Sequence, residues 1–242
     1  MVFGVRCFIG RVLLLGVIAG MGAGAVRPLE AQSTAARRAR RESNVNRRAR
    51  IQRAIEETYS HRYEVATGGG YLRFRSGDTN LHNNDVVSAT SLTYYLAPKL
   101  GIVGDLRAAF GSAKINTQIF NQPGFPAING PYRPSISHYT FMGGVRYRLV
   151  TKQRVAVSVD GLGGATYGWF DGDRLGVAPQ AIGLYADGIR PAFGVDLNLD
   201  YNFYPNLSVR LQPTYAPTLF GSTIQNNKGF NIQLVYRFGR IQ

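Results

Sequence analysis

Residues 193–203 limit the fold of this chain more than any other stretch of the sequence. Its apolar positions alternate strictly with small or polar ones: Phe193, Val195, Leu197, Leu199, Tyr201 and Phe203 against Gly194, Asp196, Asn198, Asp200 and Asn202. Successive side chains of a β-strand point to opposite faces, so such a stretch has one apolar and one polar face. A helix would mix these residues around its circumference. The stretch therefore predicts a strand that separates two different environments.

The same period of two recurs after residue 63. It is clear in six segments, residues 102–110, 138–148, 155–169, 193–203, 207–211 and 230–238. Two further segments are less regular: residues 65–75 contain three consecutive glycines, and residues 86–96 carry apolar groups on both faces. The sequence therefore predicts an all-β domain of eight strands.

The connections between these segments alternate in length. Three are tight turns, at residues 97–100, 150–153 and 204–206. The other four, at residues 76–85, 114–133, 171–189 and 216–228, are long and polar. Short turns at one end and long loops at the other are typical of an antiparallel up-and-down barrel that spans a membrane. An even number of strands would leave both termini at the end with the short turns.

Charged residues gather on the polar face of the predicted strands. We expect a charge network inside the barrel from Arg73, Asp105, Arg107, Arg146, Arg148, Asp160, Asp196, Asp200, Arg210 and Arg237. Opposite charges can neutralise one another there only if the face is enclosed, and side chains fill the interior of an eight-stranded barrel. The other face is aliphatic and aromatic, with aromatic residues near both strand ends, as at the two interfaces of a membrane. A soluble Greek-key sandwich or a lipocalin-like cup remains the alternative.

The N-terminal region, residues 1–31, has the order of a secretory signal peptide. Arg6 and Arg11 precede an apolar run over residues 12–26, and small residues follow before an expected cleavage site after Ala31. The run is shorter than the about 20 residues that cross a bilayer as a helix. An uncleaved anchor helix is the alternative.

Residues 32–62 form a basic segment. Between residues 34 and 59, eight arginines stand against three glutamates, a net charge of +5. We expect a periplasmic linker or short helix, which could contact anionic groups of the cell envelope through the arginines from Arg37 to Arg53. An export signal argues against nucleic acid as the partner, although arginine runs neutralise phosphates well.

The predicted barrel, residues 63–238, resembles the small outer-membrane barrels of the OmpA and OmpX type. The last strand is similar to the signal by which barrel-assembly machinery recognises its clients, through Phe230, Ile232, Leu234, Tyr236 and Phe238. It departs from the family pattern in the tail at residues 239–242, because the signal usually ends the chain with Phe. The resemblance implies a location in the bacterial outer membrane with both termini periplasmic. It also implies contact with outer-membrane lipids, lipopolysaccharide, the assembly machinery and periplasmic chaperones.

Groups suited to catalysis or metal binding are few. The single cysteine, Cys7, lies in the predicted signal, and the three histidines form no metal-binding motif. The glycines of residues 161–168 lack the spacing of a phosphate-binding loop, and the acidic loops at residues 78–85 and 171–173 lack the EF-hand spacing for Ca²⁺. We therefore expect no cofactor, no metal and no catalytic site, and a structural or surface-interaction role through four outer loops.

Two other functions stay open. His82 with Asp78 and Asp85 is the only cluster suited to a lipid-modifying or protease-like barrel enzyme. A narrow ion-conducting porin is the other alternative, because small ions could pass between the charged side chains of the lumen.

Overall fold

A computed structural model describes residues 44–77, 82–115, 133–170, 179–221 and 224–241. The chain divides into two units, residues 1–47 and 48–242. Of the first unit, only residues 44–47 are described, as the start of helix α2 (Asn44–Tyr59). The predicted signal peptide and the arginines from Arg37 to Arg41 lie outside the described residues.

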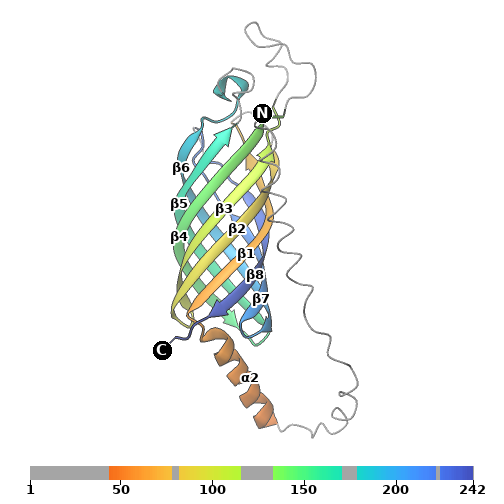
Figure 1. The fold of residues 1–242 in the computed structure, drawn as a ribbon, viewed down its shortest axis with the longest axis vertical. Coiled ribbons are helices and arrows are strands. Elements are labelled where there is room, and N and C mark those ends of the chain that lie inside the picture. Colours follow the sequence, from red (N-terminus) through yellow and green to blue (C-terminus); the bar gives the residue numbers. More distant parts are fainter. Residues whose placement is uncertain (1–43, 78–81, 116–132, 171–178, 222–223, 242) are drawn as a thin grey trace, which may run out of the picture. The chain divides into compact units, whose positions relative to one another are not determined.

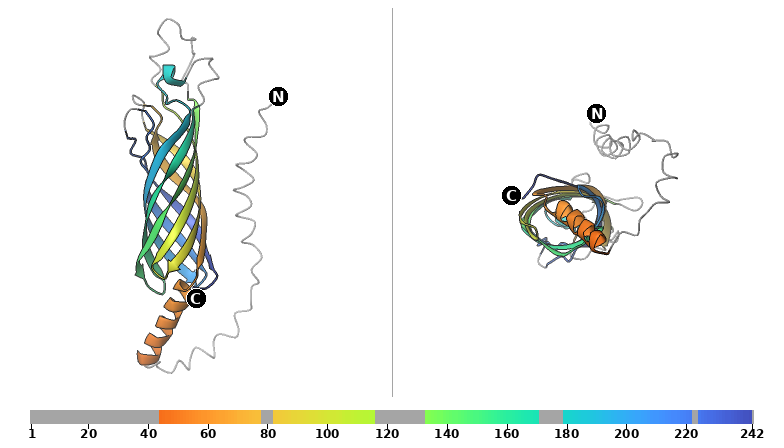
Figure 2. Two further views of the ribbon diagram at one scale, coloured as in Figure 1. Left: turned by 90° about the vertical axis from the view of Figure 1, so that its left-hand side faces the viewer. Right: turned by 90° about the horizontal axis from the view of Figure 1, so that it is seen from below.

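The second unit is a closed barrel of eight antiparallel strands (Figure 1). They are β1 (Tyr63–Arg75), β2 (His82–Ala97), β3 (Leu100–Ser112), β4 (Ser135–Thr151), β5 (Val155–Phe170), β6 (Gly188–Tyr204), β7 (Leu207–Tyr215) and β8 (Lys228–Phe238). Each strand pairs with its neighbour in the chain, and β8 pairs with β1. Viewed end-on, the strands form an unbroken ring (Figure 2). The predicted eight-stranded up-and-down barrel is confirmed.

The ring has two different ends, as the connection lengths predicted. The tight turns after β2, β4 and β6 lie at one end, called the turn end below, and the long connections lie at the other, the loop end. At each tight turn the pairing register shifts, between Tyr95 and Ala97, Arg148 and Val150, and Asn202 and Tyr204. Such irregularities increase the local twist, which helps a short hairpin close. A short 3-10 helix, η5 (Pro179–Ile182), belongs to the connection between β5 and β6.

Several strands begin before the predicted first residue. Strand β2 begins at His82 rather than near residue 86, β4 at Ser135 and β6 at Gly188. These extra residues lie at the loop end, where the alternation is not sustained: residues 82–85 are all polar, and Ile136 and Ile189 are single apolar residues among polar or small ones. Alternation of apolar and polar residues therefore marks only the middle of each strand and underestimates its length.

The predicted lumen position of Arg73 is wrong. Strand β1 turns Glu64, Ala66 and Phe74 inward, so the odd-numbered Arg73 is exposed on the outer face. Its strand neighbours are Asn84 and Lys228, near the loop end. Three glycines hide the alternation in the middle of this strand, so Leu72 and Phe74 taken alone placed Arg73 on the wrong face.

Those glycines have a packing role at the β1–β8 pair. A Cβ atom on Gly68 would lie 2.0 Å from the carbonyl oxygen of Ile232, and one on Gly70 would lie 2.0 Å from that of Phe230. Both distances are far below van der Waals contact, so the two strands can approach this closely only with glycine at these positions. The β1–β8 pair is the one that closes the ring.

Helix α2 lies within the predicted basic segment, as one of its two expected forms. Its first ten residues are almost fully exposed, whereas Thr58 and Tyr59 at its C-terminal end are buried. It has no acidic residue in its first turn and no basic residue in its last, so charge interactions with the helix dipole do not stabilise it. We infer that tertiary contacts at its buried end support it. Among the described residues, no helix has the length and apolar character needed to cross a membrane.

Candidate functional site

Nine of the ten residues predicted for the lumen are buried inside the barrel: Asp105, Arg107, Arg146, Arg148, Asp160, Asp196, Asp200, Arg210 and Arg237. Arg73 is the exception described above. The nine do not form one network. They divide into an inner layer near the turn end and a middle layer halfway along the barrel. A separate pair, Asp85 and His138, lies toward the loop end.

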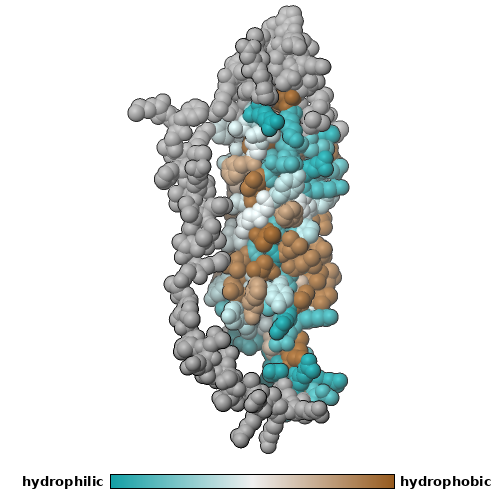
Figure 3. All heavy atoms as spheres, turned by 90° about the vertical axis from the view of Figure 1, so that its right-hand side faces the viewer, coloured by the Kyte–Doolittle hydropathy of each residue, from teal (hydrophilic) through white to brown (hydrophobic). Residues whose placement is uncertain are grey.

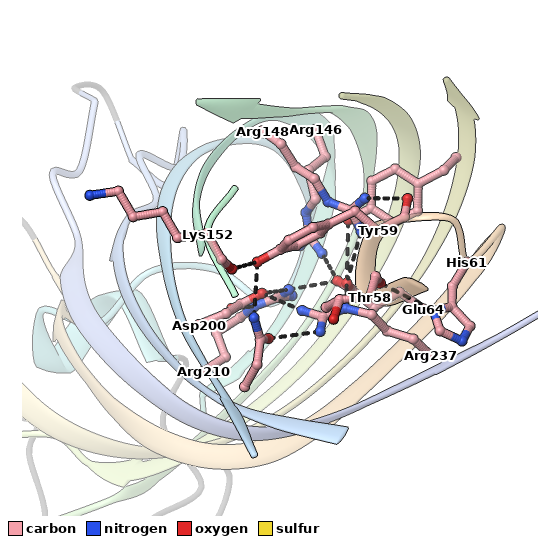
Figure 4. A network of polar contacts seen from close by, with 12 residues as sticks. Thr58, Tyr59, His61, Glu64, Arg146, Arg148, Lys152, Asp200, Arg210 and Arg237 are labelled. Carbon is pink, nitrogen blue, oxygen red and sulfur yellow. Dashed lines mark hydrogen bonds and ion pairs between the residues drawn. The ribbon is translucent and has the colours of Figure 1, made fainter. Parts of the chain in front are cut away.

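The inner layer is built around Glu64, which sequence reasoning missed. Arg146 and Arg210 both donate to its Oε1 atom, at 2.5 and 2.6 Å, and Arg237 donates to its Oε2 atom at 2.9 Å (Figure 4). A fourth guanidinium, that of Arg148, lies 3.5 Å from Oε2. One buried carboxylate on β1 thus connects arginines from β4, β7 and β8.

Two aspartates complete the inner layer. Asp160 accepts a two-pronged contact from Arg146, both hydrogen bonds being 2.7 Å long. Asp200 accepts the same kind of contact from Arg210, at 2.6 and 2.9 Å, and a further bond from Arg237 at 2.9 Å. Paired geometry of this kind is the strongest that an arginine makes with a carboxylate. The inner layer fixes strands β1, β4, β5, β6, β7 and β8 to one another.

The middle layer has a single arginine. Arg107 donates to Asp105 at 2.6 Å, to Thr214 at 2.6 Å, and to Asp196. Asp196 also accepts from Thr214 and from Gln212. One cation therefore joins two carboxylates contributed by β3 and β6.

The outer pair consists of Asp85 and His138. Nε2 of His138 lies 2.8 Å from Asp85, and the imidazole ring packs against Phe74 with ring centres 4.4 Å apart. This separates the predicted enzyme cluster: Asp85 points into the lumen, whereas His82 lies on the opposite face of β2 near Arg73 and Arg75. Asp78, the third member, lies outside the described residues, as do Asp171 and Asp173. Within the described ranges no group of three or more His, Cys, Asp or Glu side chains is arranged to hold a metal ion.

An apolar cluster lies toward the loop end of the barrel. Its members are Phe74, Ala113, Ile136, Phe170, Ile182, Leu184, Tyr185 and Phe220. Phe220 packs edge-on against Phe170, with ring centres 5.6 Å apart, and the amide of Tyr185 donates to the carbonyl of Ser76. Between this cluster and the middle layer lies a cavity of about 20 Å³, lined in part by Arg107, His138 and Asn231. That volume holds about one water molecule.

Tyr59 closes the turn end. Its hydroxyl donates to the carbonyl of Lys152 at 2.8 Å and accepts from the side-chain amide of Asn202 at 2.9 Å (Figure 4). The guanidinium groups of Arg148 and Arg237 lie 5.1 and 5.8 Å from the centre of its ring. Burial raises the pKa of the Tyr59 hydroxyl, which keeps the proton that this contact with Lys152 requires. The last residue of α2 thus covers the inner charge layer.

The outer face of the barrel is apolar. Phe141 is 59% exposed and Val195 55% exposed, although each lies in the middle of its strand. Apolar side chains gather over the middle of the face drawn in Figure 3, with hydrophilic ones toward both ends. The five residues of the predicted assembly signal belong to this surface, because Phe230, Ile232, Leu234, Tyr236 and Phe238 are each 41–54% exposed. A water-soluble protein rarely exposes apolar area on this scale.

Solved structures of low sequence identity share this fold. The outer membrane protein OprG of Pseudomonas aeruginosa is 10% identical, with a TM-score of 0.52, over 74% of this chain and 98% of that one. Neisserial surface protein A is 12% identical, with a TM-score of 0.50, over 73% of this chain and 97% of that one. A scan against protein-family models found no match, and a search of curated proteins found none either. The chain has the fold of small eight-stranded outer-membrane barrels, as the resemblance predicted.

Proposed function

We propose that this protein is an integral barrel of the bacterial outer membrane that meets its surroundings through four long outer connections, and that its own charged side chains plug its lumen. The observation that carries the proposal is the reversed distribution of charge and apolar surface. Charged side chains are buried in the centre, and aliphatic and aromatic ones cover the outside. Water would favour the opposite arrangement, whereas the hydrocarbon of a bilayer favours this one.

The plug follows from the size and content of the barrel. An eight-stranded barrel encloses only enough room for side chains. Here two charge layers, the Asp85–His138 pair and the apolar cluster occupy it in succession. Tyr59 covers the turn end. A lumen filled in this way leaves no path for bulk diffusion of solutes. It is consistent with a structural or surface-interaction role.

The orientation follows from the chain ends and loop lengths. Residues 48–62 and 239–241 adjoin the turn end, where the amide of Ile241 donates to the carbonyl of Ser60. In barrels of this kind, short turns face the periplasm and long loops face the exterior. We therefore propose that both termini are periplasmic and that the connections at residues 76–81, 113–134, 171–187 and 216–227 reach the cell exterior.

The proposed partners follow from this location. The apolar outer face would contact outer-membrane lipids, lipopolysaccharide included. The barrel-assembly machinery would recognise the last strand after periplasmic chaperones deliver the chain. Helix α2 exposes Arg47, Arg48, Arg50 and Arg53, which suits contact with anionic envelope groups.

Epitope accessibility in whole cells tests the topology. A tag inserted in residues 116–132 should bind antibody on intact cells, whereas a tag placed after residue 238 should bind only after the outer membrane is permeabilised. Labelling of both tags on intact cells would contradict the proposed orientation. A protein that fractionates with soluble periplasmic contents would refute membrane insertion itself.

Shortening one outer connection tests whether the loops are independent of the barrel. Replacement of residues 116–132 by a short Gly/Ser turn should alter surface interactions and leave folding and insertion unchanged, because β3 pairs with β4 along its whole length without this segment. Loss of the folded, heat-modifiable gel band would contradict this role for the loop. Planar-bilayer conductance of the refolded wild-type protein separates a plugged lumen from a narrow ion-conducting one.

A further inference from the structure

The inner layer carries an unbalanced charge. Four arginines, Arg146, Arg148, Arg210 and Arg237, face three carboxylates, those of Glu64, Asp160 and Asp200, which leaves a net charge of +1. The middle layer has the opposite excess, with two carboxylates around Arg107. In the part of the chain that the structure describes, no ion pair joins the two layers.

The excess positive charge is concentrated around one carboxylate. Arg146 and Arg210 share the same oxygen of Glu64, so two guanidinium groups are held close together. Both side chains are fully buried, and inside a membrane neither solvent nor salt screens the repulsion between them. A buried charge of this kind is costly unless a counter-charge accompanies it.

Two guanidinium nitrogens of this layer have no hydrogen-bond partner in the described structure. They are Nη1 of Arg210 and Nη2 of Arg148. The Arg148 atom does lie 3.5 Å from Oε2 of Glu64, which is an ion pair but does not have hydrogen-bond geometry. Both side chains are at least 97% buried and both contact Glu64. Buried guanidinium donors are normally satisfied, so these two indicate an acceptor that the protein itself does not supply.

Two neutral donors near the turn end also lack partners. The hydroxyl of Thr93, the strand neighbour of Glu64, and that of Ser208, two residues before Arg210, are buried and have no protein partner. Their side chains point into the same end of the lumen as the arginines. Hydroxyls beside guanidinium groups can donate to a negatively charged ligand, whereas a cation would be repelled here.

We propose that the inner layer binds one small monovalent inorganic anion, of the size and charge of chloride, in contact with Arg148 and Arg210. A monovalent anion neutralises the net charge of +1 and accepts the two unpartnered guanidinium N–H groups. Small size follows from the number of strands, because side chains fill most of the interior of an eight-stranded barrel. The anion would be a structural ligand of the barrel, and this inference does not depend on what the outer loops bind.

Bromide is the direct probe. Crystals of the wild-type protein grown in sodium bromide should show an anomalous-scattering peak within hydrogen-bonding distance of Arg148 and Arg210. Peaks at the surface alone would overturn the proposal, as would a water molecule at this position in bromide-grown crystals. This experiment needs no variant, so it cannot fail through misfolding.

Stability in different salts is the second test. At fixed ionic strength, replacing gluconate by chloride should lower the unfolding equilibrium constant of the refolded barrel in inverse proportion to the chloride concentration above the Kd, by about 100-fold when chloride reaches 100 times its Kd. The variant Arg148→Gln leaves three arginines against three carboxylates, so it should fold and lose the chloride dependence. The variant Arg154→Gln removes one exposed positive charge at the same end and should keep it. Equal chloride dependence in all three proteins would indicate a nonspecific effect of the anion and refute the site.

Discussion

Replacing Glu64 by glutamine removes one charge from the inner layer with almost no change in side-chain size. The side chain keeps its size and one oxygen, but a carboxylate that contacts four arginines loses its charge. The net charge of the inner layer rises from +1 to +2. Folding of the variant then requires the burial of a second unbalanced guanidinium.

The magnitude follows from the contacts. Three hydrogen bonds of 2.5–2.9 Å join Glu64 to arginines, and bonds to charged groups contribute about 1.5–3 kcal/mol each. Their sum is an upper bound, because the glutamine oxygen can still accept and because such contributions are not additive. Removing one partner of a buried ion pair costs about 3–5 kcal/mol. We expect Glu64→Gln to lower the free energy of unfolding by that amount.

Urea unfolding in lipid vesicles, followed by tryptophan fluorescence and by the heat-modifiable gel shift, measures this change. The matched control is Asp105→Asn, which removes one carboxylate from the middle layer but leaves Arg107 paired with Asp196. It brings that layer to neutrality, so it should cost less than Glu64→Gln. The central role of this carboxylate would be refuted if the free energy of unfolding of Glu64→Gln lay within about 1 kcal/mol of the wild-type value. It would also be refuted if Glu64→Gln lost less stability than Asp105→Asn.

Three further predictions concern the outer face, the closing strand pair and the turn end. Leu106→Arg puts a charge on the lipid-facing side of β3 and should cost about 2–4 kcal/mol in vesicles; Ile224→Arg, in an outer connection and 61% exposed, should cost little. Gly68→Ala should prevent formation of the heat-modifiable band because its Cβ meets the backbone of β8, whereas Gly104→Ala, with open space around its Cβ, should fold normally. Tyr59→Ala removes the hydrogen bonds to Lys152 and Asn202 at the turn end and should lower the free energy of unfolding, while planar-bilayer conductance should stay at the wild-type level because the charge layers still fill the lumen; a raised conductance would show that Tyr59 alone seals it.

How far the site could be predicted depends on whether the sequence shows which residues of a strand, the odd-numbered or the even-numbered, face the lumen. In β6 the alternation is unbroken, so Asp196 and Asp200 were assigned to the lumen correctly. In β1 the glycines interrupt it, and Arg73 was assigned to the wrong face. The signal that could have corrected this is the start of the strand, where Tyr63 and Val65 flank Glu64. Extending that parity turns Glu64 inward and Arg73 outward.

Sequence alone was sufficient for the eight strands, their up-and-down order and the reversed placement of charge, because these depend on a local period of two and on connection lengths. Only the tertiary structure decided which charges meet. Some partners lie on paired strands, as Arg146 and Asp160 do. Others come from across the ring, as Glu64 and Arg146 do, and these contacts depend on the tilt and register that the whole barrel adopts on closing. For that reason the alternation at the start of β1 turns Glu64 inward but does not predict its contact with Arg146, 82 residues away in the sequence.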